Sequence, residues 1–308
     1  MLYSRTSLGL EIGPSALTLC QLSGTVADPC LEKVARVALE PGALRPSLRE
    51  QNVLNAGLLT ERLTEAYGRL QTTVEKVSVS IPDSIGRILL MDVEGRFKGR
   101  KEALDIIRWK LKKSIPFDVA DVHLDYQLLK LRENGEMSLL VGLVSREVIH
   151  QYEDIVSGAG LIPARIDFNV LSHYSAFEHR LELSDAYAMV SFLNGSLGVM
   201  ACCEGVPEFL RAKDLTASAA ADERLFVEIS SSLQVFQERF PERPLQSAYC
   251  LTSPDNMETL CAMVSEIAGC APVPLEIKSV VRPADTVPGD QQTLYPFTAA
   301  IGAAMRGF

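Results

Sequence analysis

The same order of elements is predicted twice along the 308-residue chain, and this repetition constrains the fold more than any other feature. A strand hairpin is expected at residues 8–24, because two apolar runs flank a short turn that contains Gly13. A second hairpin is expected at residues 187–203, and strands that alternate with helices follow each hairpin. This weak internal duplication predicts a two-lobed α/β protein with a cleft between the lobes.

The first half contains additional elements that predict an inserted βαββα unit. Strands are expected at 87–93, 122–131 and 137–145, and Asn134-Gly135 is typical of a hairpin turn between the last two. A helix is expected at 101–114, and it should end there because the proline that follows cannot continue it. We expect a first lobe at residues 1–183 with the insert at about 84–160, and a second lobe at 184–308 with a small helical subdomain at about 212–245. A further strand is expected from Leu275 to Val280.

Composition excludes several classes of protein. The net charge of −9 argues against a nucleic-acid binder, which needs a basic face. No secretory signal and no apolar run of membrane-spanning length are expected, which favours a cytoplasmic protein. The seven cysteines form no metal-binding pattern, and Cys202 and Cys203 would point to opposite faces of one strand. We therefore expect reduced, buried thiols, and none of the four histidines forms a metal-binding pair.

Several stretches of the chain resemble the PilM family of type IV pilus assembly, in the same order as in that family. The most specific is RWKLKKSIPFDVADVHLDYQLL at 108–129, which combines a basic helix, an Ile-Pro-Phe turn and a following strand. The resemblance extends over nearly the whole chain. The other stretches are LGLEIGPSALTLCQL near the start, SVSIPDSIGRILLM at 78–91, GAGLIPARIDF at 158–168, VEISSSLQVFQERF at 227–240 and FTAAIGAAMRGF at 297–308.

This resemblance implies an actin-like (ribonuclease H-like) two-lobed fold with an FtsA-type inserted subdomain. It also implies a cytoplasmic protein, peripheral to the inner membrane, that binds the N-terminal tail of a PilN-like membrane protein and meets other pilus platform proteins. Many members of the family bind ATP between the lobes. A cytoplasmic component of a type II secretion platform is the related alternative.

The turns that would hold ATP depart from the family pattern at three places. Glu11 replaces the metal-side aspartate, Pro14 removes a phosphate-facing N–H, and Thr18 replaces a lysine. The second turn, at 191–196, lacks its acid, and Ser253-Pro254 replaces the two glycines of the third element. The vestigial pocket implied by the resemblance comprises Gly9, Glu11, Gly13, Ser15, Thr18, Ser191, Gly195, Ser196 and Ser253.

We therefore expect no catalytic residue, no metal site and no cofactor, with bound ATP and magnesium as the alternative. Mg-ATP needs anchored cations and backbone donors to hold its phosphate charge, and these are the groups that are missing. A functional ATPase with unusual turns stays an alternative. A small-molecule kinase of the same fold is a second one, but it needs a catalytic aspartate, and Asp185 precedes the strand that would have to present it.

Two features of the insert are candidates for partner binding. Trp109, Ile115, Pro116 and Phe117 could form a peptide-docking surface beside the insert, or they could belong to its core. Docking would use β-augmentation or pockets for side chains. A basic run extends over 96–113 in this acidic chain; it is either a solvated helix face or a surface for anionic lipid headgroups or an acidic partner.

Overall fold

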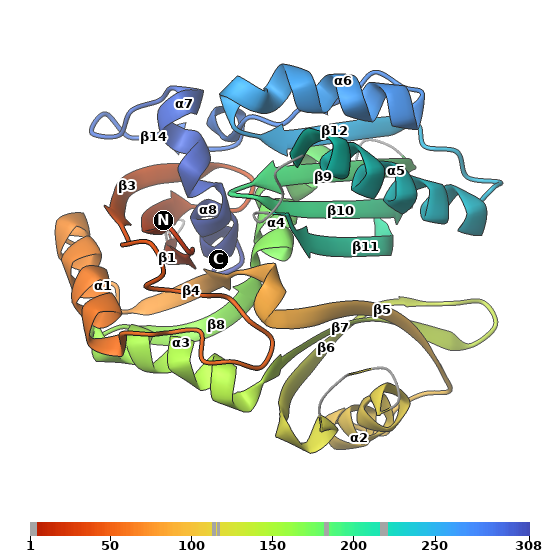
Figure 1. Cartoon of the computed structure of the whole chain (residues 1–308), viewed down its shortest axis with the longest axis horizontal. Coiled ribbons are helices and arrows are strands. Elements are labelled where there is room, and N and C mark those ends of the chain that lie inside the picture. Colours follow the sequence, from red (N-terminus) through yellow and green to blue (C-terminus); the bar gives the residue numbers. More distant parts are fainter. Residues whose placement is uncertain (1–4, 113–114, 116–117, 182–184, 216–220) are drawn as a thin grey trace.

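The computed structural model describes residues 5–112, 115, 118–181, 185–215 and 221–308, which form two α/β lobes and an inserted three-stranded unit (Figure 1). The first lobe is built on a six-stranded sheet in the order β14-β3-β2-β1-β4-β8. β1, β4 and β8 run parallel, and β1, β2 and β3 form an antiparallel meander. The strands are β1 (Arg5–Ile12), β2 (Ala16–Gly24), β3 (Pro29–Ala38), β4 (Lys76–Ile81), β8 (Ile162–Phe168) and β14 (Arg282–Pro283).

Helices cover both faces of this sheet, and the alternation of its strands decides which side chains meet them. Leu17 and Leu19 of β2 belong to the apolar cluster that includes residues of α1 and α3, whereas Cys20 belongs to the cluster that includes residues of α8 on the other face. α8 lies between the two lobes beside α4 (Figure 1). The helices are α1 (Ala56–Leu70), α3 (Arg146–Gly158), α4 (Asn169–Leu181), α7 (Gln291–Leu294) and α8 (Thr298–Met305), with short 3-10 turns at Asp83–Ile85 and Tyr295–Phe297.

The second lobe is built on a five-stranded sheet in the order β11-β10-β9-β12-β13. α5 and α6 cover one face, and α5 occupies most of the segment expected as a helical subdomain. Cys202 and Cys203 belong to apolar clusters on opposite faces of the sheet, which confirms the expected alternation. The elements are β9 (Ala186–Leu193), β10 (Ser196–Cys203), β11 (Val206–Asp214), α5 (Ala221–Arg239), β12 (Ser247–Thr252), α6 (Met257–Ala268) and β13 (Val273–Pro274), with a 3-10 turn at Pro254–Asn256.

The prediction of a strand from Leu275 to Val280 is wrong. The pairing with β12 ends at Pro274, and Ile277–Ser279 is a 3-10 turn whose first residue is buried. The chain turns here because it must leave the edge of the second-lobe sheet and reach β3, where β14 pairs. A buried apolar residue in a turn has no strand period, so the sequence alone could not distinguish it from a strand residue.

The inserted unit has its own sheet, in the order β5-β7-β6, and its own apolar core against α2. Its elements are β5 (Gly86–Glu94), α2 (Arg100–Leu111), a 3-10 turn (Val119–Asp121), β6 (Val122–Leu131) and β7 (Glu136–Ser145). The hairpin predicted at Asn134-Gly135 joins β6 to β7. α3 completes the βαββα order but packs in the first-lobe core beside α1. No helix in the described ranges has the length and apolar character needed to cross a membrane.

Candidate functional site: turns between the lobes and a groove beside the insert

The β1–β2 turn uses part of its backbone groups in hydrogen bonds within the protein. The Gly13 N–H donates to Ala16 O at 3.0 Å, and Ser15 O accepts from Leu39 N at 2.8 Å. Thr18 Oγ1 donates to Glu11 Oε2 at 3.1 Å, and both residues are buried. The Gly13 N–H that could have faced a phosphate is therefore already used within the turn.

The Glu11 carboxyl lies in a poor environment for a negative charge. Burial raises its pKa to about 7, although the Thr18 hydrogen bond and the charge of Arg36 oppose this shift. A carboxyl with such a pKa is partly protonated at neutral pH. Because divalent cations bind carboxylates rather than carboxylic acids, binding of Mg²⁺ at this position would have to displace that proton. Among the described residues, no three His, Cys, Asp or Glu side chains are grouped to hold a metal ion.

Asp83 connects the two lobes at this place. It follows β4 and accepts hydrogen bonds from Val170 N at 3.0 Å and from Ser196 Oγ of the second lobe at 3.3 Å. Burial raises the pKa of Asp83 to about 6. Ser196 was expected in the second turn, whereas Asp83 was not singled out, although it lies inside the stretch SVSIPDSIGRILLM that carries the resemblance.

The remaining residues of the predicted pocket have structural partners. Gly9 faces α8, where an added Cβ would lie 1.9 Å from Ala300 O. Gly195 accepts a hydrogen bond from Leu215 N, and Ser253 O accepts one from Asn256 N. Ser191 is buried, and its hydroxyl lies 3.4 Å from Gly198 O.

A cavity of about 600 Å³ lies between the lobes. It is lined by residues of the 3-10 turn Asp83–Ile85, β5, β11 and α5, and by none from the β1–β2 turn.

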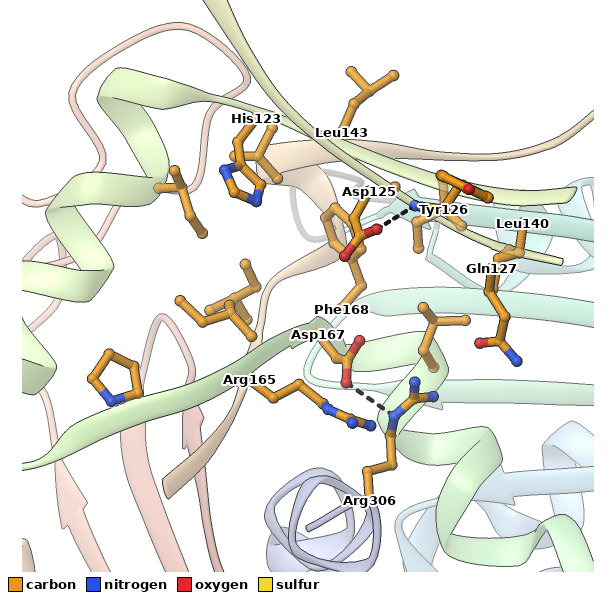
Figure 2. Close-up of a pocket in the computed structure, with 18 of the residues that line it drawn as sticks. His123, Asp125, Tyr126, Gln127, Leu140, Leu143, Arg165, Asp167, Phe168 and Arg306 are labelled. Atoms are coloured by element: carbon orange, nitrogen blue, oxygen red, sulfur yellow. Dashed lines mark hydrogen bonds and ion pairs between the residues drawn. The ribbon is translucent and has the colours of Figure 1, made fainter. Parts of the chain in front are cut away.

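A larger groove, of about 710 Å³, lies between β8 of the first lobe and the β6–β7 hairpin of the insert (Figure 2). β8 is the last strand of the six-stranded sheet, and β6 is the last strand of the three-stranded sheet. Each therefore has one edge to which no described strand is paired. Two open edges along one groove form a ready template for an extended peptide.

The groove combines an apolar floor with charged walls. Ile88, Val144 and Phe168 line it together with polar side chains from both walls. Figure 2 shows the polar side chains converging from β6, β8 and the end of α8. Asp167 Oδ2 pairs with Arg306 Nε at 3.0 Å. Burial raises the pKa of Asp167, against the charges of Arg306 and Arg165. The polar lining residues that carry charge or hydrogen-bonding groups are His123, Asp125, Gln127, Glu153, Arg165, Asp167 and Arg306.

Arg165 is the groove cation that is available for a ligand. Its side chain is exposed, and it makes no hydrogen bond or ion pair with any described residue. Asp125, on the opposite wall, is already paired with Arg100 at 2.8 Å. A carboxylate or an exposed carbonyl of a bound peptide would therefore find an unpaired donor at Arg165.

The predicted partner residues do not line this groove where the structure describes them. Trp109 lies on the outer face of α2 with 76 % of its surface exposed, and Ile115 packs against the core of the insert. Pro116 and Phe117 lie outside the described residues. The groove residues were not predicted as partner residues from the sequence. Its two walls are nevertheless formed by parts of two stretches that carry the resemblance, HLDYQ at 123–127 and PARIDF at 163–168.

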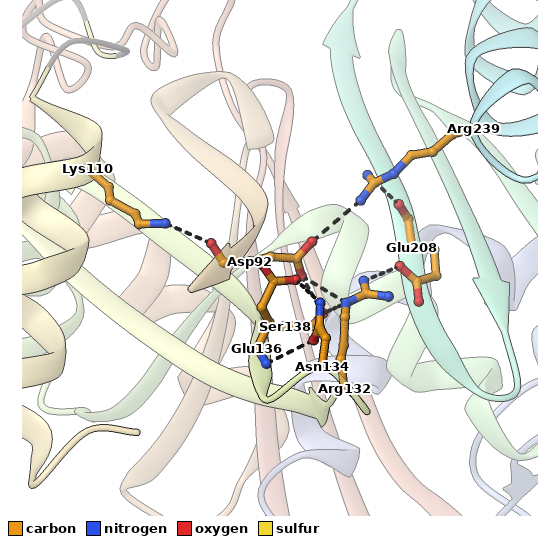
Figure 3. Close-up of polar contacts among 8 residues, drawn as sticks. All are labelled: Asp92, Lys110, Arg132, Asn134, Glu136, Ser138, Glu208 and Arg239. Atoms are coloured by element: carbon orange, nitrogen blue, oxygen red, sulfur yellow. Dashed lines mark hydrogen bonds and ion pairs between the residues drawn. The ribbon is translucent and has the colours of Figure 1, made fainter. Parts of the chain in front are cut away.

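An ionic network fixes the insert, and with it the β6 wall, against the second lobe (Figure 3). Arg132, which follows β6, reaches Asp92 Oδ1 at 3.1 Å and Glu208 Oε2 at 2.8 Å. Asp92 also lies 3.7 Å from Arg239 of α5. Lys130 pairs with Glu204 at 2.9 Å, beside the same hairpin. Side chains from β5, β6, β11 and α5 thus hold the groove wall in position.

We expect Arg132→Met to lower the free energy of unfolding by about 2 kcal/mol, because it leaves the buried Glu208 carboxylate without its partner. Urea denaturation measures this loss. Arg69→Met is the matched control, since Arg69 pairs with Glu65 on an exposed helix face and should change stability by less than about 0.5 kcal/mol. Equal effects of the two substitutions would contradict a special role for the network.

Comparison with known proteins identifies the family. The family model of the type IV pilus assembly protein PilM matches residues 9–192, which is more than half of the chain. The chain belongs to the PilM family. No curated protein sequence matches it.

Solved structures show that the fold is actin-like. The chain superposes on a structure described as the PilM–PilN type IV pilus biogenesis complex with a TM-score of 0.81, at 22 % identity and over 98 % of both chains. It also matches the cytoplasmic domain of EpsL, an inner-membrane component of the type II secretion system of Vibrio cholerae, with a TM-score of 0.51, 16 % identity, and coverage of 80 % of this chain and 82 % of that one. A Bacteroides thetaiotaomicron protein with an actin-like ATPase fold gives a TM-score of 0.51 at 10 % identity, covering 95 % and 94 % of the two chains. The fold class expected from the sequence is thus confirmed.

Proposed function

We propose that this PilM-family protein is a non-catalytic cytoplasmic scaffold of type IV pilus assembly, and that its groove between β6 and β8 binds the N-terminal tail of a PilN-like inner-membrane protein. The observation that carries this proposal is the pair of open strand edges that line one groove. A partner anchored in the inner membrane would hold the protein at the membrane surface. That a relative was solved as a PilM–PilN complex supports the choice of partner.

The groove suits an extended tail for three reasons. An added strand would satisfy the backbone groups of an open edge, which supplies affinity without requiring a particular sequence. Alternate side chains of such a strand would point into the floor that contains Ile88, Val144 and Phe168. Arg165 would select a tail with an acidic or carbonyl group at the matching position.

Binding of the tail should depend on Arg165. Calorimetry with a synthetic peptide of the PilN-like tail from the same genome is expected to show that Arg165→Glu weakens the Kd at least about tenfold, because a charge-assisted contact is replaced by repulsion. Arg45→Glu makes the same charge change at an exposed position outside the groove and should leave the Kd within about twofold. Equal Kd values for wild type and Arg165→Glu would contradict the groove as the binding site.

We also propose that the pocket between the lobes no longer supports ATP hydrolysis. Support comes from the Gly13 N–H that is already bonded within the β1–β2 turn, from the raised pKa of Glu11 and from the hydrogen bond between Ser196 and Asp83. Binding at a ligand concentration of 100 times Kd would stabilise the fold by roughly 2.7 kcal/mol, and we expect millimolar Mg-ATP to give much less in a thermal-shift measurement. Steady ATP hydrolysis by the pure protein that is lost in Glu11→Ala would overturn this proposal and favour the ATPase alternative.

A further inference from the structure

The outer surface of the insert carries an unusual concentration of positive charge for this chain. Between residues 94 and 112 there are seven lysines and arginines and three carboxylates, although the whole chain has a net charge of −9. Four of these cations, Arg96, Lys98, Lys101 and Lys112, are exposed, and their side chains make no hydrogen bond or ion pair with any described residue. These four charges are therefore not paired with any carboxylate among the described residues.

Two of the three carboxylates interact with groups that are close to them in sequence. Glu102 accepts a hydrogen bond from the backbone N–H of Lys98 at 2.5 Å, before the start of α2, and Asp105 lies 3.6 Å from Arg108 on the next turn. Glu94 lies at the end of β5. The carboxylates thus reduce the positive potential of the surface without pairing with its four free cations.

Apolar side chains are exposed beside these cations. Trp109, the only tryptophan of the chain, is 76 % exposed, because Ala103, Ile107 and Leu111 are the residues of α2 that turn toward the core. Trp109 and Ile106 line a shallow depression together with Lys98 and Lys101 and with the two carboxylates that already have local partners, Glu102 and Asp105. On the other side of Gly99, Leu128 and Leu131 are 51 % and 47 % exposed next to Phe97 and Arg96.

We propose that this surface, comprising Arg96, Lys98, Lys101, Ile106, Trp109 and Leu128, binds directly to the anionic headgroups of a lipid bilayer. Long lysine and arginine side chains reach headgroup phosphates while their stems stay in apolar surroundings. A tryptophan flanked by lysines is suited to the boundary between headgroups and acyl chains. An acidic protein could pair with the cations. The exposed tryptophan and two exposed leucines do not form one deep pocket for a protein side chain, so a bilayer would bury them better.

The position of this surface agrees with the groove described above, although the proposal does not depend on it. Tyr126 of β6 lines both the groove and the depression that contains Leu128. Contact of the outer surface with a bilayer would keep the groove close to the membrane, so that a tail emerging from an anchored partner would need to cross only a short distance.

The test uses the full chain without any partner protein, so that failure of the groove proposal cannot affect it. At about 150 mM salt, wild type is expected to sediment with vesicles of phosphatidylglycerol and phosphatidylethanolamine but not with vesicles of phosphatidylcholine. The emission of Trp109 should shift to shorter wavelength on the anionic vesicles only. Sedimentation without a change in Trp109 emission would show that another surface binds, and would overturn the proposal.

Charge reversal locates the contact. Lys98→Glu/Lys101→Glu should weaken binding to the anionic vesicles by roughly 30-fold, since each lysine near an anionic surface contributes to binding. Lys76→Glu/Arg224→Glu makes the same change in net charge at exposed positions of β4 and α5 and should weaken binding far less. Equal weakening by the two pairs would overturn the assignment to this surface. Absence of vesicle binding by wild type would overturn the membrane contact and leave an acidic protein as the partner to seek.

Discussion

Replacement of Gly302 by valine is expected to lower the free energy of unfolding by about 3 kcal/mol, because α4 and α8 approach too closely to admit a side chain between them. A Cβ at Gly302 would lie 1.8 Å from Ser172 O and 2.7 Å from Ser172 C, and both are backbone atoms. Relief requires one helix to move away from the other. Since α8 also packs on β1, such a movement would disturb the first-lobe core as well.

Urea denaturation of Gly302→Val against wild type measures this loss. Gly68→Ala is the matched control, because Gly68 lies on the exposed face of α1 with no atom within 4 Å of an added Cβ. It should raise stability by up to about 1 kcal/mol, through the better helix propensity of alanine. A Gly302→Val protein as stable as wild type would show that the two helices are further apart than described.

Gly9 shows that a sequence pattern can single out a residue without revealing its structural role. The resemblance placed Gly9 in a nucleotide-binding turn, and the structure gives it a packing role, since α8 crosses β1 at this residue. The partner atoms, Ala300 O and Ala304 N, are almost 300 residues away in sequence. No local pattern reports such a contact, so a glycine required for packing and a glycine required for phosphate binding look alike in one sequence.

The fold was predictable because it depends on local patterns that repeat. Hairpins, the βαββα order of the insert and the opposite faces of Cys202 and Cys203 all follow from the period of apolar residues over ten or fewer positions. The short segment after β13 was not predictable in this way. Its apolar residues are buried by a chain reversal rather than by a strand, and only the tertiary path of the chain decides between the two.

The groove was not predictable from the same information, although the segments that form its walls lie in stretches that carry the resemblance. Whether β6 and β8 are edge strands depends on the order of strands in two sheets, which hydrophobic period does not determine. The residues expected to bind a partner or to form the core of the insert were instead Trp109, Ile115, Pro116 and Phe117. That expectation rested on the resemblance and on the general rule that exposed aromatic residues mark interfaces. The structure separates the first two, with Trp109 on an outer surface and Ile115 against the core of the insert.

The stability of Glu11→Gln relative to wild type is expected to increase as pH rises. Burial raises the pKa of Glu11 from 4.5 to about 7, so between these values the folded protein holds a proton that the unfolded chain releases. Wild type therefore loses stability as pH rises from about 4.5 to about 7, because the unfolded chain is stabilised by releasing this proton while the folded protein keeps it. Glutamine keeps a neutral side chain of similar shape at all pH values. At pH 8 the variant should be more stable by about 3 kcal/mol, and near pH 4.5 the difference should be close to zero.

Urea midpoints from pH 5 to 8 test this expectation, with Glu61→Gln as the control at an exposed position of α1. Asp83, whose pKa is raised to about 6, gives wild type a pH dependence of the same sign, but it is present in both proteins and largely cancels in the difference. Parallel pH profiles for wild type and Glu11→Gln would show that Glu11 is ionised throughout. The chain would then still present the carboxylate that a metal-bound nucleotide requires, and the case against a functional ATP site would rest on the turns alone.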